Sequence, residues 1–224
     1  MTSQKCQILL LGDSSVGKTA IFSRLSGKSF NEKSVSTIGT DKKTINLDDV
    51  EIETNEKRNF KITLFDTAGQ ERYRSITKTY FKDSQGIILI YSIIDPGSFE
   101  HVQIWLESIK ESLSDWKRSG YIVMLLGNKL DIVEEDKEKR EVLYEETEQL
   151  CKDQDIYWGG ECSAKTFDID KIKKIFELLA KEIYLKLKEC DDEDNFKQKS
   201  TKNVKDLKVT KKIKNICCQK VEVV

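Results

Sequence analysis

The feature that most constrains the fold is an apolar run at residues 5–11 that ends directly at a glycine-rich loop, GDSSVGKT, at residues 12–19. A short apolar run of this kind is typical of a strand that is buried on both faces of a sheet. The loop fits the pattern GxxxxGK[ST], which binds phosphate when a strand precedes it and a helix follows it. The sequence predicts both neighbours, so we expect an α/β fold.

Further apolar runs alternate with helical patterns along the chain. Residues 60–65, 86–91 and 121–126 repeat the strand pattern, and a last strand is expected from residue 155 onward. Apolar residues at steps of three or four predict helices over 99–113, with Ser98 as N-cap, and over 172–187. This alternation predicts a doubly wound, mostly parallel six-stranded sheet with helices on both faces.

One section departs from the alternation. Residues 44–47 and 60–65 have the pattern of strands, but the segment between them is too short and too polar for a crossover helix. The two strands are therefore predicted to form an antiparallel hairpin at the edge of the sheet. The connection, residues 48–59, is rich in Glu, Asp, Asn and Lys, so we expect it to be solvated and mobile.

The glycine-rich loop carries the first candidate binding residues. Its backbone N–H groups and the N-terminus of the following helix are expected to point at bound phosphates. Lys18 is expected to reach the β- and γ-phosphates, and Thr19 to ligate Mg²⁺. The phosphate-binding residues predicted in this loop are Asp13, Ser14, Ser15, Val16, Gly17, Lys18, Thr19 and Ala20.

A second loop, DTAGQ at residues 66–70, follows the strand predicted at 60–65. It places Asp66 at a strand C-terminus, the edge where ligands of open α/β sheets bind, and Asp66 is expected to hold Mg²⁺. Gly69 can turn its peptide toward a γ-phosphate, and Gln70 can orient an attacking water. Gln70 and Lys18 are the predicted catalytic residues.

Two further loops are predicted to select the base. Asp131 in the NKLD sequence at 128–131 can accept hydrogen bonds from guanine and rejects adenine, whose donor pattern is the opposite. In the ECSAK sequence at 161–165, the backbone N–H of Ala164 is expected to meet the base carbonyl. The predicted guanine-binding residues in these two loops are Asn128, Lys129, Asp131, Ser163, Ala164 and Lys165.

The four loops resemble those of the Ras superfamily of small GTPases, and their details are most similar to the Rab family: GDSSVGKT, STIG, DTAGQERYRSIT, NKLD and ECSAK. The resemblance covers about residues 5–187. It implies a P-loop GTPase domain that binds GTP and GDP with Mg²⁺, hydrolyses GTP slowly, and switches in intracellular vesicle trafficking. It also implies that Thr37 ligates Mg²⁺ and that Phe30 packs edge-on against guanine.

The same resemblance implies several partners: an exchange factor, a GTPase-activating protein, effectors that bind the GTP state, and a dissociation-inhibitor or escort protein. Rab effectors commonly bind an apolar patch formed by three positions, and this chain differs from the family at two of them. Lys42 replaces an aromatic residue, Phe65 stands where Trp is usual, and Tyr80 matches. The usual set of effectors is therefore not implied.

Three alternative functions fit the sequence less well. A P-loop kinase of a small metabolite would share the phosphate loop, but it would need an arginine-rich lid, and the six arginines of the chain are not clustered. A scaffold that binds GTP without turnover is disfavoured by Thr37 and Gln70, and a turnover assay decides between them. Binding of nucleic acid by the tail is disfavoured because Phe196 is the only aromatic residue there to stack a base.

The C-terminal part is predicted to be a separate segment. Residues 197–224 hold nine lysines against Asp206 and Glu222, a local charge of +7 that leaves −8 on the rest. We expect a GTPase domain over 1–189 and a disordered tail over 190–224. Cys217 and Cys218 follow the lysines as in doubly prenylated Rab tails, although six more residues come after them.

Composition bears on the compartment. The start of the chain lacks the pattern of a secretory signal, and the six cysteines show no CxxC pair. We therefore expect a cytoplasmic protein with reduced thiols, held peripherally on the cytosolic face of an endomembrane.

Overall fold

The computed structural model describes residues 3–31, 40–54, 56–67, 81, 83–113 and 121–202, with side chains up to residue 190. Four site predictions lie wholly outside these residues: Thr37, Gly69, Gln70 and the pair Cys217 and Cys218. Tyr80 lies outside them as well.

The described residues build one six-stranded sheet in the order β2-β3-β1-β4-β5-β6. The pair β2 and β3 is antiparallel, and all other neighbours are parallel. The predicted fold class is confirmed. The strands are β1 (Gln4–Leu11), β2 (Thr40–Glu53), β3 (Glu56–Thr67), β4 (Gly86–Ser92), β5 (Ile122–Asn128) and β6 (Tyr157–Glu161).

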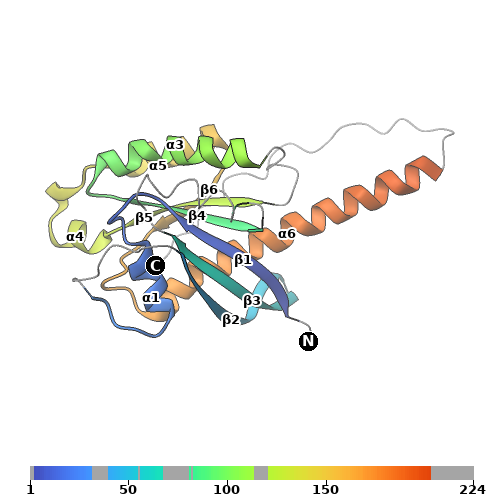
Figure 1. Ribbon diagram of the computed structural model, residues 1–224, viewed down its shortest axis with the longest axis horizontal. Helices are drawn as coiled ribbons and strands as arrows, with labels where there is room; N and C mark the ends of the chain where they lie inside the picture. Colours follow the sequence, from blue (N-terminus) through green and yellow to red (C-terminus); the bar gives the residue numbers. More distant parts are fainter. Residues whose placement is uncertain are drawn as a thin grey trace.

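Helices cover both faces of the sheet, with α3 and α5 on one side and α1 and α6 on the other (Figure 1). Alternate residues of β1 explain why both faces need cover. Ile8 and Leu10 pack in the core on the α6 side, while Leu9 and Leu11 pack in the core on the α3 side. The helical segments are α1 (Lys18–Leu25), α3 (Pro96–Ser112), α4 (Leu130–Glu135), the 3-10 turn η2 (Lys137–Lys139), α5 (Tyr144–Gln154) and α6 (Ile169–Lys202).

The start of α3 differs from the prediction that Ser98 is its N-cap. The cap is Asp95, whose side chain accepts a hydrogen bond from the backbone N–H of Ser98 at 3.3 Å, and Pro96 follows it inside the helix. Proline is favoured at the first helical position because it has no N–H to leave unsatisfied. Ser98 instead uses its hydroxyl to join the helix to the backbone of Ser92 at the end of β4.

The hairpin also differs from the prediction. Most of residues 48–59, expected to be a mobile connection, belongs to the two long strands β2 and β3. A register shift between Leu47 and Val50 lets Val50 and Ile52 turn into the core, where they are 5% and 1% exposed. The polar composition hid this apolar pair. At the tip, the hydroxyl of Tyr184 on α6 donates to Glu56 at 3.2 Å, which fixes the hairpin against the helix.

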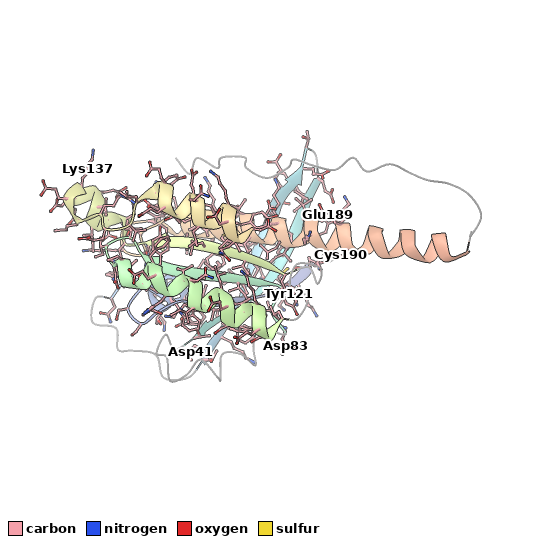
Figure 2. All side chains as sticks on the ribbon, turned by 90° about the horizontal axis from the view of Figure 1, so that it is seen from above. Asp41, Asp83, Tyr121, Lys137, Glu189 and Cys190 are labelled. Carbon is pink, nitrogen blue, oxygen red and sulfur yellow. The ribbon has the colours of Figure 1, made fainter. Side chains whose placement is uncertain are left out.

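The last helix is longer than predicted. It was expected to end near Leu187, with disorder from 190, but α6 continues past Glu189 and Cys190 to Lys202 (Figure 2). No glycine or proline occurs between Ile169 and Lys202, so the sequence contains no helix breaker in this range. The prediction of disorder is therefore wrong for 190–202. Within the described ranges, none of the helices combines the length and hydropathy that a membrane span requires.

Candidate functional site

The phosphate loop lies between the C-terminal end of β1 and the first residue of α1, as predicted. Gly17 has φ of +104°, and a Cβ added there would lie 2.1 Å from the side-chain nitrogen of Asn128. Glycine is therefore required at this position both for the backbone conformation and for the close approach of a neighbouring loop. Ser14 and Ser15 are exposed, Val16 is buried, and Ala20 is half-buried at the start of α1.

Lys18 lies across the loop that precedes it. Its ammonium donates to the backbone oxygens of Gly12 at 2.9 Å and Asp13 at 2.5 Å, and the side chain is only 4% exposed. Burial lowers the pKa of Lys18 to about 8, and the nearby carboxylates of Asp66 and Asp13 partly oppose this by raising it. A buried ammonium held by neutral carbonyl groups is well placed to gain from an anionic ligand.

The two predicted magnesium ligands from different elements meet. Thr19 donates from its hydroxyl to Oδ2 of Asp66 at 2.7 Å, and Asp66 is fully buried at the end of β3. The adjacent Thr67 fastens β3 to β1, because its hydroxyl donates to the backbone oxygen of Leu10 at 2.8 Å. Mg²⁺ prefers oxygen ligands and is commonly held by one or two carboxylates together with substrate phosphates. The hydroxyl and carboxylate present here fit that requirement.

Asn128 joins three loops at the end of β5. Its side-chain nitrogen donates to the backbone oxygen of Val16 at 2.8 Å, and its side-chain oxygen accepts from the backbone N–H of Ala164 at 3.0 Å. The prediction gave this N–H of Ala164 to a base carbonyl. In the structure Asn128 uses it, so a base carbonyl would have to share it. Asn128 is 2% exposed and acts as a clamp between the phosphate loop and the loop after β6.

Asp131 is held in place by the loop that follows β6. Ser163 donates from its hydroxyl to Oδ1 of Asp131 at 2.6 Å, and the same hydroxyl oxygen accepts the backbone N–H of Lys165. Asp131 is 6% exposed. One carboxylate oxygen is thus fixed by the protein, which restricts the orientation that the other can present.

Lys129 and Phe30 are the two residues predicted to contact the faces of the base. Lys129 has φ of +75° and N-caps α4, and burial lowers its pKa while Asp95 and Asp131 act in the opposite direction. Phe30, beyond α1, is half-buried.

Several residues that support the site belong to none of the sequence motifs. Arg140 holds Glu161, the first residue of the ECSAK loop, through two hydrogen bonds of 2.6 and 2.7 Å. His101 and Trp105 on α3 both contact the side chain of Asp13. The sequence contains one weak indication of the contacts with Asp13: the only histidine of the chain lies four residues before a tryptophan on a predicted helix.

The loops after β1, β5 and β6 and the C-terminal end of β3 thus meet at one edge of the sheet. A family model described as "Ras family" matches residues 7–185 of the chain. The chain belongs to the Ras family. Its members are GTPases that bind GTP and GDP with Mg²⁺, and this chain is a GTPase of that family.

Similar proteins place the chain among Rab-like members of the Ras family. It is 39% identical over 212 residues to Ras-related protein Rab-13 of Rattus norvegicus, which covers 94% of each chain. It is 40% identical over 180 residues to Ras-related protein Rab-13 of Canis lupus familiaris, 80% of each chain. Identity to Ras-related protein Rab-8B of Homo sapiens is 38% over 192 residues, 84% of this chain and 83% of the relative.

These findings confirm the predicted resemblance and the Rab-like type of GTP-binding switch that regulates vesicle trafficking. Members of this family work with exchange factors, activating proteins and effectors, and this chain is expected to have partners of the same three classes.

Proposed function

We propose that this Rab-like GTPase reads guanine through Asp131, holds the phosphates with the loop after β1, and works on the cytosolic face of an endomembrane. The observation that supports the site assignment most directly is the clamp by Asn128. It fastens the loop that carries Lys18 to the loops that carry Asp131 and Ser163, so a phosphate region and a base region are held at a fixed spacing.

The phosphate side is assigned to residues 13–20 and Gly69. In the nucleotide-bound protein the ammonium of Lys18 transfers from the oxygens of Gly12 and Asp13 to the β- and γ-phosphates, because a charged acceptor makes the stronger hydrogen bond. Thr19, Thr37 and Asp66 hold Mg²⁺, which neutralises charge on the phosphates when it is bound.

The base side is assigned to Phe30, Asn128, Lys129, Asp131, Ser163, Ala164 and Lys165. Asp131 accepts from the guanine ring, Ser163 keeps its carboxylate in the required orientation, and Lys129 and Phe30 cover the ring. Adenine offers the opposite pattern and would leave Asp131 buried with an unmatched partner, which costs about 1 to 3 kcal/mol or more.

Hydrolysis is assigned to water oriented by Gln70. Thr37 and Gly69 sense the γ-phosphate. Loss of that phosphate releases the segments that carry these two residues, and effectors read the difference between the GTP and GDP states.

Membrane attachment is assigned to Cys217 and Cys218 behind the lysine-rich stretch. A single lipid chain gives only marginal binding, so two chains or one chain with a basic patch are needed. Each lysine close to an anionic leaflet adds about 1 kcal/mol. A dissociation-inhibitor or escort protein would carry the lipidated form through the cytosol.

Base choice tests the site assignment. Labelled GDP bound to the wild type should be displaced by GTP and not by ATP. Asp131→Asn should lose guanine nucleotide and bind xanthosine diphosphate, whose ring reverses the pattern, while Ser163 can still donate to Oδ1 of the new amide. Asn59→Asp, the reverse change far from the site, is the control and should retain guanine preference. Equal displacement by ATP and GTP would remove the base-reading role of Asp131.

A further inference from the structure

The side chain of Asp13 contacts two residues of α3. Its Oδ1 accepts a hydrogen bond from the indole N–H of Trp105 at 2.9 Å, and its Oδ2 lies 2.5 Å from Nδ1 of His101. A carboxylate can only accept at this distance, so Nδ1 of His101 carries the proton. Both donors come from α3 and lie four residues apart, on one face of the helix.

The two contacts differ in how firmly they are anchored. Trp105 is 2% exposed and belongs to the core between α3 and the sheet, so its N–H has a fixed position. The His101 side chain is about half-exposed. Asp13 is therefore held by one rigid donor, Trp105, and one solvent-accessible donor, His101. We expect Trp105 to contribute more to holding the carboxylate in place.

The backbone of the same residue completes the connection. The carbonyl oxygen of Asp13 accepts from the ammonium of Lys18. A shift of Asp13 therefore moves an acceptor of Lys18 and the peptide that precedes the phosphate-facing N–H groups. In addition, a carboxylate left free in this loop would repel the phosphates, since like charges close together are unfavourable.

We propose that His101 and Trp105 are positioning residues of the phosphate loop, which hold the carboxylate of Asp13 against α3 and thereby slow the release of nucleotide. The proposal rests on the proposed phosphate-binding role of residues 13–20. It makes α3, which carries none of the four nucleotide-binding loops, a determinant of how long GDP stays bound.

The test measures the dissociation rate of a fluorescent GDP analogue from full-length protein with Mg²⁺. Trp105→Phe keeps an aromatic ring but removes the donor, and should speed release on the order of tenfold. His101→Phe should speed it about two- to fivefold, the scale of a partly exposed pair. His101→Asn places an amide donor near the position of Nδ1 and should restore a rate close to that of the wild type.

Two controls separate positioning from a loss of stability. Gln103→Ala alters a solvent-side residue of the same helix that bonds only to Glu107 among the described contacts, and should leave the release rate unchanged. In an Asp13→Asn background the charge is gone, so His101→Phe should have little further effect. A thermal melt of each GDP complex shows whether folding is intact.

The outcomes distinguish this inference from the proposed function. Wild-type protein that binds no GDP would remove the proposed function itself. Wild-type protein that binds GDP, with variants that are folded and release it at the wild-type rate, would overturn the positioning role alone. Additive effects of His101→Phe and Asp13→Asn would also overturn it, because they would mean that the two residues act independently.

Discussion

Asn128 donates a hydrogen bond to the backbone oxygen of Val16 across 2.8 Å, in a contact from which solvent is excluded. Asn128 ends β5 and Val16 lies in the glycine-rich loop after β1, so the two residues are far apart in the sequence. The NKLD sequence and the glycine-rich loop are therefore linked directly by the protein. Changes at Asn128 should affect both halves of the site.

Asn128→Asp tests this link. The substitution replaces the donor with a second carboxylate oxygen facing the oxygen of Val16, which leaves a buried acceptor unsatisfied at a cost of about 1 to 3 kcal/mol. We expect release of both GDP and GTP to accelerate about 5- to 150-fold. Asn59→Asp, whose side-chain oxygen remains an acceptor for Asp49 in the hairpin, provides the matched control. Stopped-flow release of labelled nucleotide is the measurement, and equal rates for the two variants would contradict the linking role.

Gly17 and Gly27 offer a paired test of strain against collision. Both have positive φ, +104° and +78°, but a Cβ at Gly17 would meet Asn128 at 2.1 Å, whereas nothing lies within 4 Å at Gly27. Gly27→Ala should cost only the left-handed conformation, about 1 to 2 kcal/mol. Gly17→Ala should cost more and should also impair nucleotide binding. Urea unfolding and a binding titration on both variants measure this, and similar losses of affinity would show that the contact with Asn128 does not matter.

Lys18 should destabilise the nucleotide-free protein near neutral pH. A folded pKa of about 8 against the ordinary 10.5 corresponds to on the order of 3 kcal/mol. Because the unfolded chain then binds the proton more tightly, stability from this group rises with pH between about 8 and 10.5. Nucleotide-free Lys18→Met should therefore be more stable than the wild type at pH 7, and the difference should shrink toward pH 10.

The comparison with Lys18→Met removes a competing effect. Burial raises the pKa of the Cys6 thiol to about 11, so the contribution of this thiol to the stability of the folded protein falls as the pH rises. This decrease is the same in the wild type and in Lys18→Met. Lys28→Met, at an exposed position, should show no such dependence. Urea unfolding at several pH values gives the answer, and a gap between wild type and Lys18→Met that is constant with pH would contradict the assignment.

Gln70→Leu should separate binding from hydrolysis. The wild type should turn over on the order of 10⁻⁴ to 10⁻³ per second alone, since no arginine matches a finger supplied by the chain itself. An activating protein should raise the rate by a factor of about 10⁵, roughly 7 kcal/mol of barrier. The variant should bind GTP as the wild type does and lose most of the stimulated rate. Single-turnover phosphate release tests this, and a wild-type stimulated rate in the variant would refute the role of Gln70.

The pair Cys217 and Cys218 should carry the membrane anchor. The double variant Cys217→Ser and Cys218→Ser should shift from the membrane to the supernatant fraction of its own cells, because the lysines alone supply only a screened attraction. Cys190→Ser, at a partly exposed position on α6, is the control and should partition as the wild type does. Mass spectrometry reports the modification directly. Unmodified thiols, with unchanged partitioning of the double variant, would exclude the anchor and leave the nucleotide chemistry as it is.

The sequence predicted the sheet well because buried parallel strands are written as short apolar runs. All seven residues of β4 and of β5 are buried, and the polar residues Ser92 and Asn128 come only at their C-terminal ends. The hairpin was harder, since its buried residues Val50 and Ile52 sit among charged neighbours on a strand with a register shift. Val50 and Ile52 pack in the same core as residues of α6, and the composition of the hairpin alone does not indicate this long-range packing.

Within the candidate site, too, some residues could be predicted from the sequence and others could not. Motif residues were found because phosphate and base recognition require particular side chains at fixed spacing. The contacts of Asp13 with His101 and Trp105, and of Arg140 with Glu161, join residues far apart in the chain and follow no motif. Only the folded structure brings these pairs together, and it also shows that Ala164 already donates to Asn128.

The length and direction of α6 decide where the end of the chain departs from the domain. The helix starts shortly after the ECSAK sequence and runs back along the sheet, so its far end projects beyond the end where β1 begins (Figure 1). With 34 residues at about 1.5 Å each, it spans about 50 Å. It is a stalk rather than a tether. The last described residue, Lys202, therefore lies at the opposite end of the protein from the loops after β1 and β5, and α6 holds it away from those loops by its own length.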